Sequence, residues 1–112
     1  MADPRQQDLA ARIRTGLPPG RVVREVPMFG GLSFMLDNRM IMSVRRDGSL
    51  LVRVDPDRSS ELLSVPGARP AVMGANRSMG PGWLTVAAEG LTTEQQLTDW
   101  IEVALQHHQA AT

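Results

Sequence analysis

Apolar residues recur at every second position through the middle of the chain, a spacing typical of strands that bury one face. Beyond Gly30 and Gly31, three segments with this spacing follow one another: LSFML, RMIMSV and SLLVRV. Turn-forming residues separate them, first Asp37-Asn38 and then Arg46-Asp47-Gly48. Strands joined by such turns pair as antiparallel hairpins. The sequence therefore predicts a three-stranded meander after an extended segment, RVVREVPMF, whose proline suits an edge or a strand end.

The turns also predict how the strands pair. At the first turn, a two-residue loop gives the pairs Phe34–Ile41 and Met35–Met40. At the second turn we prefer a three-residue loop, because it places Gly48 in the left-handed conformation that such loops require and builds one continuous apolar face. The pairs it predicts are Val44–Leu50, Met42–Val52 and Met40–Val54.

Helical patterns flank the strands. The first begins with Asp3 as N-cap, Pro4 at the first position and Gln6 completing a capping box, and it ends at Gly16. The last begins at Thr92 or Thr93 and carries an apolar stripe at helical spacing. That stripe consists of Leu97, Trp100, Ile101, Ala104 and Leu105.

The segment DPDRSSELLSVPG predicts a short middle helix capped by Asp55, and two strands follow it. One is expected near Arg69 to Met73 and the other at GWLTVAA, with the turn-rich loop GANRSMGPG between them. The predicted fold class is α+β, with an antiparallel sheet flanked by N-terminal, middle and C-terminal helices in the order α-βββ-α-ββ-α. Residues 1–112 are expected to form a single domain, since no linker or repeat interrupts them.

The preferred register leaves apolar residues on both faces of the sheet. The face opposite the continuous apolar one is mixed; its members are Arg39, Ile41, Ser43, Arg45, Leu51 and Arg53. A sheet that is apolar on both faces needs cover on both. Helices are expected on one face and a second subunit over part of the other, where Met35, Met40 and Met42 favour core or dimer packing over an adaptable binding surface. The sequence thus predicts a homodimer.

The composition excludes several kinds of covalent chemistry. The chain has no cysteine, and all 12 of its basic residues are arginine, which excludes disulfides, thiolate chemistry and lysine Schiff bases. The charges balance, yet residues 1–77 hold all 12 arginines and 8 acids, whereas residues 78–112 hold four acids and no arginine.

No apolar run is long enough for a membrane span, and the charged N-terminus lacks the apolar core of a secretion signal. A cytoplasmic protein without membrane contact is expected.

An enzymatic role is not predicted. Tyrosine is also absent, so the usual nucleophile–base pairs cannot be assembled. His107 and His108 are adjacent and point about 100° apart on a helix, which makes joint chelation of one metal ion unfavourable. We expect them at a frayed helix end, where a cationic histidine suits the helix dipole. No metal site, catalytic residue or cofactor is predicted.

Two groups of residues remain as candidate functional positions. Met28, Phe29, Gly30 and Gly31 do not form a phosphate-binding motif, since a P-loop needs lysine. We expect one glycine to take a positive φ at the strand entry or to permit close backbone approach, with Met28 and Phe29 inserting into the core or an interface. The second group, Arg39, Arg45, Arg46 and Arg53, can meet phosphates or an acidic protein surface. A solvated sheet edge that resists aggregation is the preferred reading of these arginines.

A family resemblance joins these segments. VPMFGGLSFMLDNRMIMSV, then DGSLLVRVD, RSMGPGWLTV and LTDWIEVAL, resemble the N-terminal domain of the TfoX/Sxy family from about Arg21 to His108. The resemblance implies a compact α+β domain with an antiparallel sheet flanked by helices, in a fold also seen in chaperone-like dimeric proteins. Full-length members act in bacterial natural competence, promoting transcription of DNA-uptake genes together with the cyclic-AMP receptor protein, and carry a second domain.

The resemblance carries over no catalytic residue, and the chain ends just after the matching region, as expected of a single-domain member. It favours a non-enzymatic regulatory module that acts by protein–protein contact, with a protein of transcription regulation as a candidate partner. A nucleic-acid-binding accessory protein that uses the four arginines is the alternative.

Overall fold

The computed structural model of the chain describes residues 4–20, 22–28, 30–73 and 77–111. Helix α1 (Pro4–Gly16) precedes four strands, β1 (Val23–Met28), β2 (Gly31–Leu36), β3 (Arg39–Val44) and β4 (Leu50–Arg53). A 3-10 turn η1 (Pro56–Arg58) and the short helix α2 (Ser59–Leu62) follow, then β5 (Ala68–Pro70), β6 (Val72–Met73), β7 (Arg77–Ser78) and β8 (Trp83–Val86). The chain closes with the 3-10 turn η2 (Ala88–Gly90) and helix α3 (Glu94–Ala111).

Six strands form one antiparallel sheet in the order β1-β2-β3-β4-β8-β5. The predicted α+β class is confirmed, and β1 turns the expected meander into four strands. The predicted strand from Arg69 to Met73 is wrong as one element, because the chain leaves the sheet after Pro70 and Val72–Met73 pairs with β7 in a separate hairpin. That hairpin also takes Arg77 and Ser78 out of the predicted loop.

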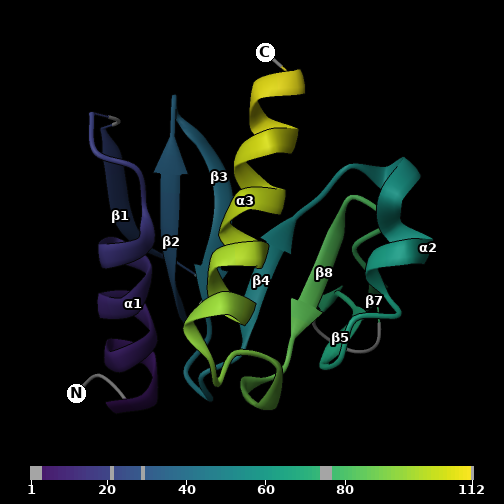
Figure 1. Cartoon of the computed structure of the whole chain (residues 1–112), viewed down its shortest axis with the longest axis horizontal. Helices are drawn as coiled ribbons and strands as arrows, with labels where there is room; N and C mark the ends of the chain where they lie inside the picture. Colours follow the sequence, from purple (N-terminus) through teal and green to yellow (C-terminus); the bar gives the residue numbers. More distant parts are fainter. Residues whose placement is uncertain (1–3, 21, 29, 74–76, 112) are drawn as a thin grey trace.

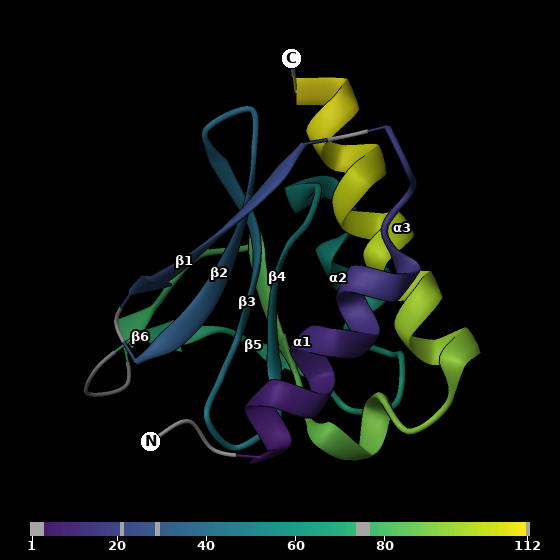
Figure 2. The ribbon, with the colours of Figure 1, turned by 90° about the vertical axis from the view of Figure 1, so that its left-hand side faces the viewer.

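Helices α1 and α3 lie side by side on one face of the sheet (Figures 1 and 2), and within the described ranges no helix lies over the other face. We call these two sides the helix face and the open face. Side chains alternate between the faces along each strand, and paired residues share a face. The β6–β7 hairpin lies on the open-face side (Figure 2).

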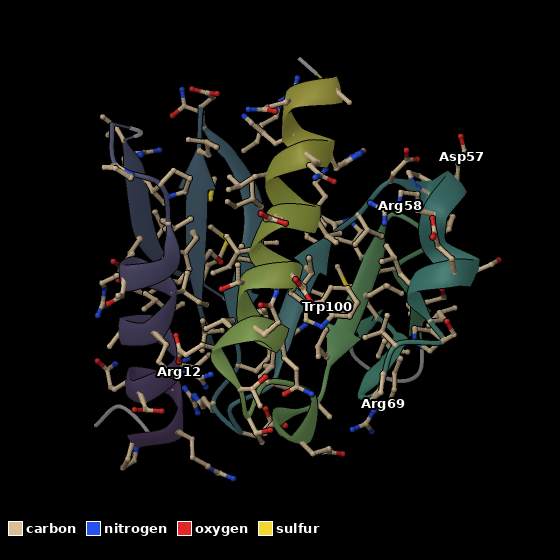
Figure 3. All side chains as sticks on the ribbon, viewed as in Figure 1. Arg12, Asp57, Arg58, Arg69 and Trp100 are labelled. Atoms are coloured by element: carbon tan, nitrogen blue, oxygen red, sulfur yellow. The ribbon has the colours of Figure 1, made fainter. Side chains whose placement is uncertain are left out.

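The core lies between the helices and the helix face. Fully buried side chains on the strands include Phe34, Val44, Leu50, Val52 and Leu84, and they pack into one cluster with the apolar stripes of the helices. Leu9 and Ile13 come from α1; Leu97, Trp100, Ile101 and Ala104 come from α3. Trp100 points from α3 toward β8 (Figure 3). The predicted α3 stripe is confirmed.

Residues in the first turn of each long helix make side-chain hydrogen bonds that cap α3 and attach α1 to the sheet. At the start of α3, Gln96 donates its backbone N–H to Thr93 Oγ1 at 3.1 Å, and Gln96 Oε1 accepts the Thr93 N–H at 3.0 Å. This reciprocal pair is a capping box, so Thr93 is the N-cap. In α1, Asp3 lies outside the described residues, and Gln6 donates its side-chain Nε2 to the Val44 carbonyl at 2.9 Å. Gln6 thus joins α1 to the end of β3.

The second hairpin has the predicted register, with Val44 opposite Leu50 and Met42 opposite Val52. Gly48 has a φ of +84°, as the three-residue loop requires. The predicted pair Met40–Val54 is not formed, because the ladder ends at Val52 and the Val54 N–H bonds to the Gly82 carbonyl.

The first hairpin departs from the prediction by one residue. Asp37 and Asn38 both have positive φ, at 53° and 65°, so the two-residue turn is confirmed and Met35 pairs with Met40. Phe34, however, lies opposite Met42 rather than Ile41, because a β-bulge interrupts the ladder at Phe34/Met35. The bulge places Ile41 in the core, fully buried beside Met42.

The histidine prediction was wrong for His108. Helix α3 continues to Ala111, and His108 is 1% exposed rather than frayed. Its Nε2 atom lies 2.8 Å from Asp37 Oδ2 in the β2–β3 turn, 71 residues away in sequence. This contact fixes the C-terminal end of α3 to the tip of the first hairpin.

We expect His108→Ala to lower the free energy of unfolding by about 2–3 kcal/mol, because it leaves a cavity and removes a hydrogen bond at a buried site. Urea denaturation followed by circular dichroism measures the change. Gln106→Ala, at an exposed position of the same helix, is the control and should change stability by less than about 0.5 kcal/mol. Equal stability of the two variants would contradict the anchoring role.

Candidate functional site

The two adjacent glycines join β1 to β2 and have different conformational roles. Gly30 has a φ of +77°, which side chains rarely adopt. Gly31 is buried opposite Met28, and a Cβ there would lie 2.7 Å from Ser43 Oγ and 3.2 Å from the Val44 carbonyl oxygen. Gly30 therefore makes the turn, and Gly31 lets β3 approach. Met28 is half-buried on the open face, and Phe29 lies outside the described residues.

A hollow of about 620 Å³ opens beside this turn on the open face. Its lining comes from the β1–β2 turn, the β3–β4 loop, β8 and the β6–β7 hairpin. The lining residues are Gly30, Arg45, Arg46, Asp47, Ser49, Val72 and Thr85, and we refer to this site as the hollow.

The structure separates the four candidate arginines. Arg45 and Arg46 line the hollow at the end of β3. Arg39 begins the same strand, about 20 Å away at 3.3 Å per residue. Arg53 ends β4 opposite Trp83, and its charge reaches His107 of α3. The four arginines therefore do not form one cluster.

The expected common face was wrong for Arg39 and Ile41. Arg39 pairs with Leu36, which points into the core, and Ile41 is buried there too. The bulge between Met40 and Met42 shifts the alternation of β3 by one residue, so only the part of β3 beyond it keeps the predicted phase. Ser43, Leu51 and Arg53 remain at open-face positions of the ladder.

Sequence analysis predicted strands near Arg69 to Met73 and at GWLTVAA, but it did not place β5, β8 and the small hairpin beside the candidate arginines. One row of paired residues crosses the open face from β2 to β5: Ser33, Ser43, Leu51, Thr85 and Arg69. This row brings Arg69 next to Thr85 of the hollow. The only signal in the sequence was the alternation within GWLTVAA, which does not show that β8 inserts between β4 and β5.

The open face is basic in its strand positions. Arg24, Arg53 and Arg69 occupy strand positions that alternate away from the core, and Arg45 directly follows β3. Across the six strands, all of whose residues are described, the one carboxylate is Glu25, which pairs with Phe34 and is bonded to Arg14 of α1 on the helix face. The arginines of this face therefore have no carboxylate beside them in the ladder.

Ser49 fixes the carboxylate of the hollow. Asp47 Oδ1 accepts hydrogen bonds from Ser49 Oγ at 2.6 Å and from the Ser49 N–H at 2.9 Å. The hydroxyl first, and the backbone N–H second, hold the pKa of Asp47 below its usual range. Asp47 is thus a stable anion at neutral pH and not a group poised to exchange protons.

The guanidinium groups of the hollow do not exchange protons near neutral pH. A guanidinium is always protonated near neutral pH, so Arg45 and Arg46 are hydrogen-bond donors and point charges. Away from the hollow, burial lowers the pKa of His107.

No cluster of three potential metal ligands occurs among the described residues. Within those same residues, no helix is long and apolar enough to cross a membrane.

We expect Gly31→Ala to destabilise the protein by about 1–3 kcal/mol, since the added methyl group overlaps Ser43 Oγ and the Val44 carbonyl. Ser43→Ala in the same chain should recover part of the loss by removing the closer contact. Chemical denaturation of the two single variants and the double variant measures this coupling. Strictly additive effects would show that the two residues do not press on one another.

Acid should reveal the Asp47–Ser49 contact. The pKa of Asp47 is lower in the folded protein than in the unfolded chain, where it is about 3.9. The contact therefore adds to the free energy of unfolding at pH values above about 3.9, and this contribution is lost as the pH falls through the folded-state pKa. Ser49→Ala should therefore reduce stability at neutral pH and flatten the loss of stability in acid. Urea unfolding across a pH series measures both effects, with the exposed Ser60→Ala as control. An unchanged acid slope in Ser49→Ala would contradict the assignment.

Comparison with known proteins agrees with this architecture. Comparison with curated proteins finds no match. Among solved structures, the chain is similar to a structural-genomics target from Pseudomonas syringae, at 15% identity and a TM-score of 0.53, covering 73% of this chain and 83% of that one. At this identity the likeness concerns the fold alone. The family described as the TfoX N-terminal domain matches residues 17–108, from the end of α1 through the buried His108 of α3. Since that match spans most of the sequence, the chain belongs to the TfoX N-terminal domain family.

Proposed function

We propose that this domain is a non-enzymatic regulatory module that works by protein–protein contact through the open face of its sheet. The observation that carries the proposal is that large apolar side chains on this face are only partly buried. They are Val26, Met28, Met35, Met40 and Trp83. Exposed apolar patches mark interaction sites, and methionine side chains repack readily against a partner. The unreactive charged groups of the hollow support the non-enzymatic part of the proposal.

The edges of the sheet are poorly suited to the same task. A partner that adds a strand needs free backbone N–H groups along an edge. The two edge strands are β1 and β5, and each contains a proline, Pro27 and Pro70. Proline removes a donor, and β5 is only three residues long. Contact through the face is therefore favoured over extension of the sheet.

The first partner we propose is a second copy of this chain, which gives a cytoplasmic homodimer. The second is a protein of transcription regulation, in keeping with the resemblance to the competence regulators. A two-fold contact buries the partly buried apolar side chains of both copies at once. It also brings open-face arginines of the two copies toward each other. Salt should therefore strengthen a face-to-face dimer by screening this repulsion.

Nucleic-acid binding is the second candidate function. Arg45, Arg46 and Arg69 support it, because the open face carries no carboxylate at its strand positions. Asp47, which also lines the hollow, accepts hydrogen bonds from Ser49. Binding of this kind weakens steeply with salt, since counterions are released from the nucleic acid. The two candidates thus have opposite salt dependences.

Solution mass across concentration and salt series tests the proposal. Light scattering should report a dimer of the 12.2 kDa chain, strengthened by added salt. Met40→Arg should dissociate it by placing a charge in the apolar contact, whereas the control Gln106→Arg, on an exposed face of α3, should not. A monomer at every concentration would reject self-association. DNA affinity that falls with salt and is lost in Arg45→Gln/Arg46→Gln would instead favour the second candidate.

A further inference from the structure

We propose that the hollow binds the phosphate group of a small organic phosphate ester, a ligand of nucleotide or sugar-phosphate size. This goes beyond the proposed contact function, because a small-molecule site does not require a partner protein. The argument rests on the charge of the lining, the placement of its two guanidinium groups and the size of the space.

The lining carries a net positive charge. Arg45 and Arg46 supply two cations, and Asp47 supplies one anion. The Arg45 backbone bonds to Ser49 and Gly48 within the β3–β4 loop. Neither guanidinium group, however, has a hydrogen bond or ion pair with any residue that the structure describes. Asp47 Oδ1 is occupied by Ser49, so this carboxylate is held by its own loop. The two guanidinium groups therefore keep donors for an external anion, and their planar forks match the geometry of phosphate.

The double glycine helps to place one of these groups. A Cβ at Gly30 would lie 3.8 Å from Arg46 Nε and 3.9 Å from Arg46 Cζ, so the guanidinium lies directly beside the turn. Gly30 has no side chain to shield it from the hollow. The neighbouring Gly31 brings β2 close to β3, the strand that ends beside Arg45. The two glycines thus shape one wall of the hollow.

The size and the opposite wall indicate an ester rather than free phosphate. A space of about 620 Å³ falls within the range of small-molecule sites, roughly 300–1,000 Å³. Val72 of the small hairpin is 49% exposed at the hollow, and Thr85 adds a methyl group and a hydroxyl donor. An organic group attached to the phosphate can pack on Val72 while the phosphate meets the arginines.

Nuclear magnetic resonance titration of the full chain tests the site. AMP and a sugar phosphate are the probes, with adenosine as the uncharged analogue and inorganic phosphate as the bare anion. We expect both esters to shift the amide signals of Gly30, Val72 and Thr85, inorganic phosphate to bind more weakly, and adenosine to have no effect. Arg45→Gln/Arg46→Gln should weaken ester binding roughly 10- to 100-fold, since charge-assisted hydrogen bonds are lost. The matched control is Arg58→Gln, whose arginine pairs with Glu61 at 3.0 Å next to α2.

Three results would overturn the proposal. The first is the absence of shifts with either ester at millimolar concentration. The second is equal ester affinity in the double variant and the control, once both show the dispersed spectrum of a folded protein. The third is binding of single-stranded DNA through Arg45 and Arg46 without binding of either ester, which would assign the arginines to a nucleic-acid surface. Because the hollow lies on the open face, the titration is run at a protein concentration at which light scattering gives the monomer mass. The contact function is then judged separately, by the solution mass across the concentration series.

Discussion

The rest of the structure depends on one constraint: side chains alternate between the two faces of the sheet, and helices cover only one of those faces. Every second residue of β2, β3, β4 and β8 must enter the core under α1 and α3, and the residues between them must face the other way. In this chain those other residues are Gly31, Ser33, Met35, Met40, Ser43, Leu51, Arg53, Trp83 and Thr85. The composition of the open face is therefore a direct consequence of how the core is filled.

One extra residue modifies this constraint at a decisive place. The β-bulge in β3 adds Ile41 to the core beside Met42 and reverses the alternation between that point and the first hairpin turn. Arg39 is thereby taken away from the face that carries Arg45. The turn beyond it contains Asp37, which bonds to the buried His108 and fixes the end of α3. The bulge and the histidine thus shape the same end of the molecule, far from the hollow.

The Met-Phe-Gly-Gly segment connects fold and site. Gly31 is required by the close approach of β3, a matter of packing, while Gly30 forms the turn and leaves Arg46 uncovered at the hollow. A structural role and a binding role therefore do not exclude each other at these positions. The partly buried methionines and Trp83 also lie on the open face, which concentrates the proposed contacts on one side of the sheet.

The sequence by itself determined the elements whose signals are local. The period of apolar residues located α3 and the strands of the meander, and Thr93 and Gln96 form a capping box that their spacing encodes. The glycine at position 48 and the continuous apolar face together favoured the three-residue loop that sets the register of the second hairpin. Only the tertiary structure decided the features that depend on distant partners. The insertion of β8 between β4 and β5, the bulge at Ile41, the His108–Asp37 contact and the hollow all join segments far apart in sequence. These features form only when distant segments pack together in the core. A local apolar period or a turn sequence therefore does not predict them.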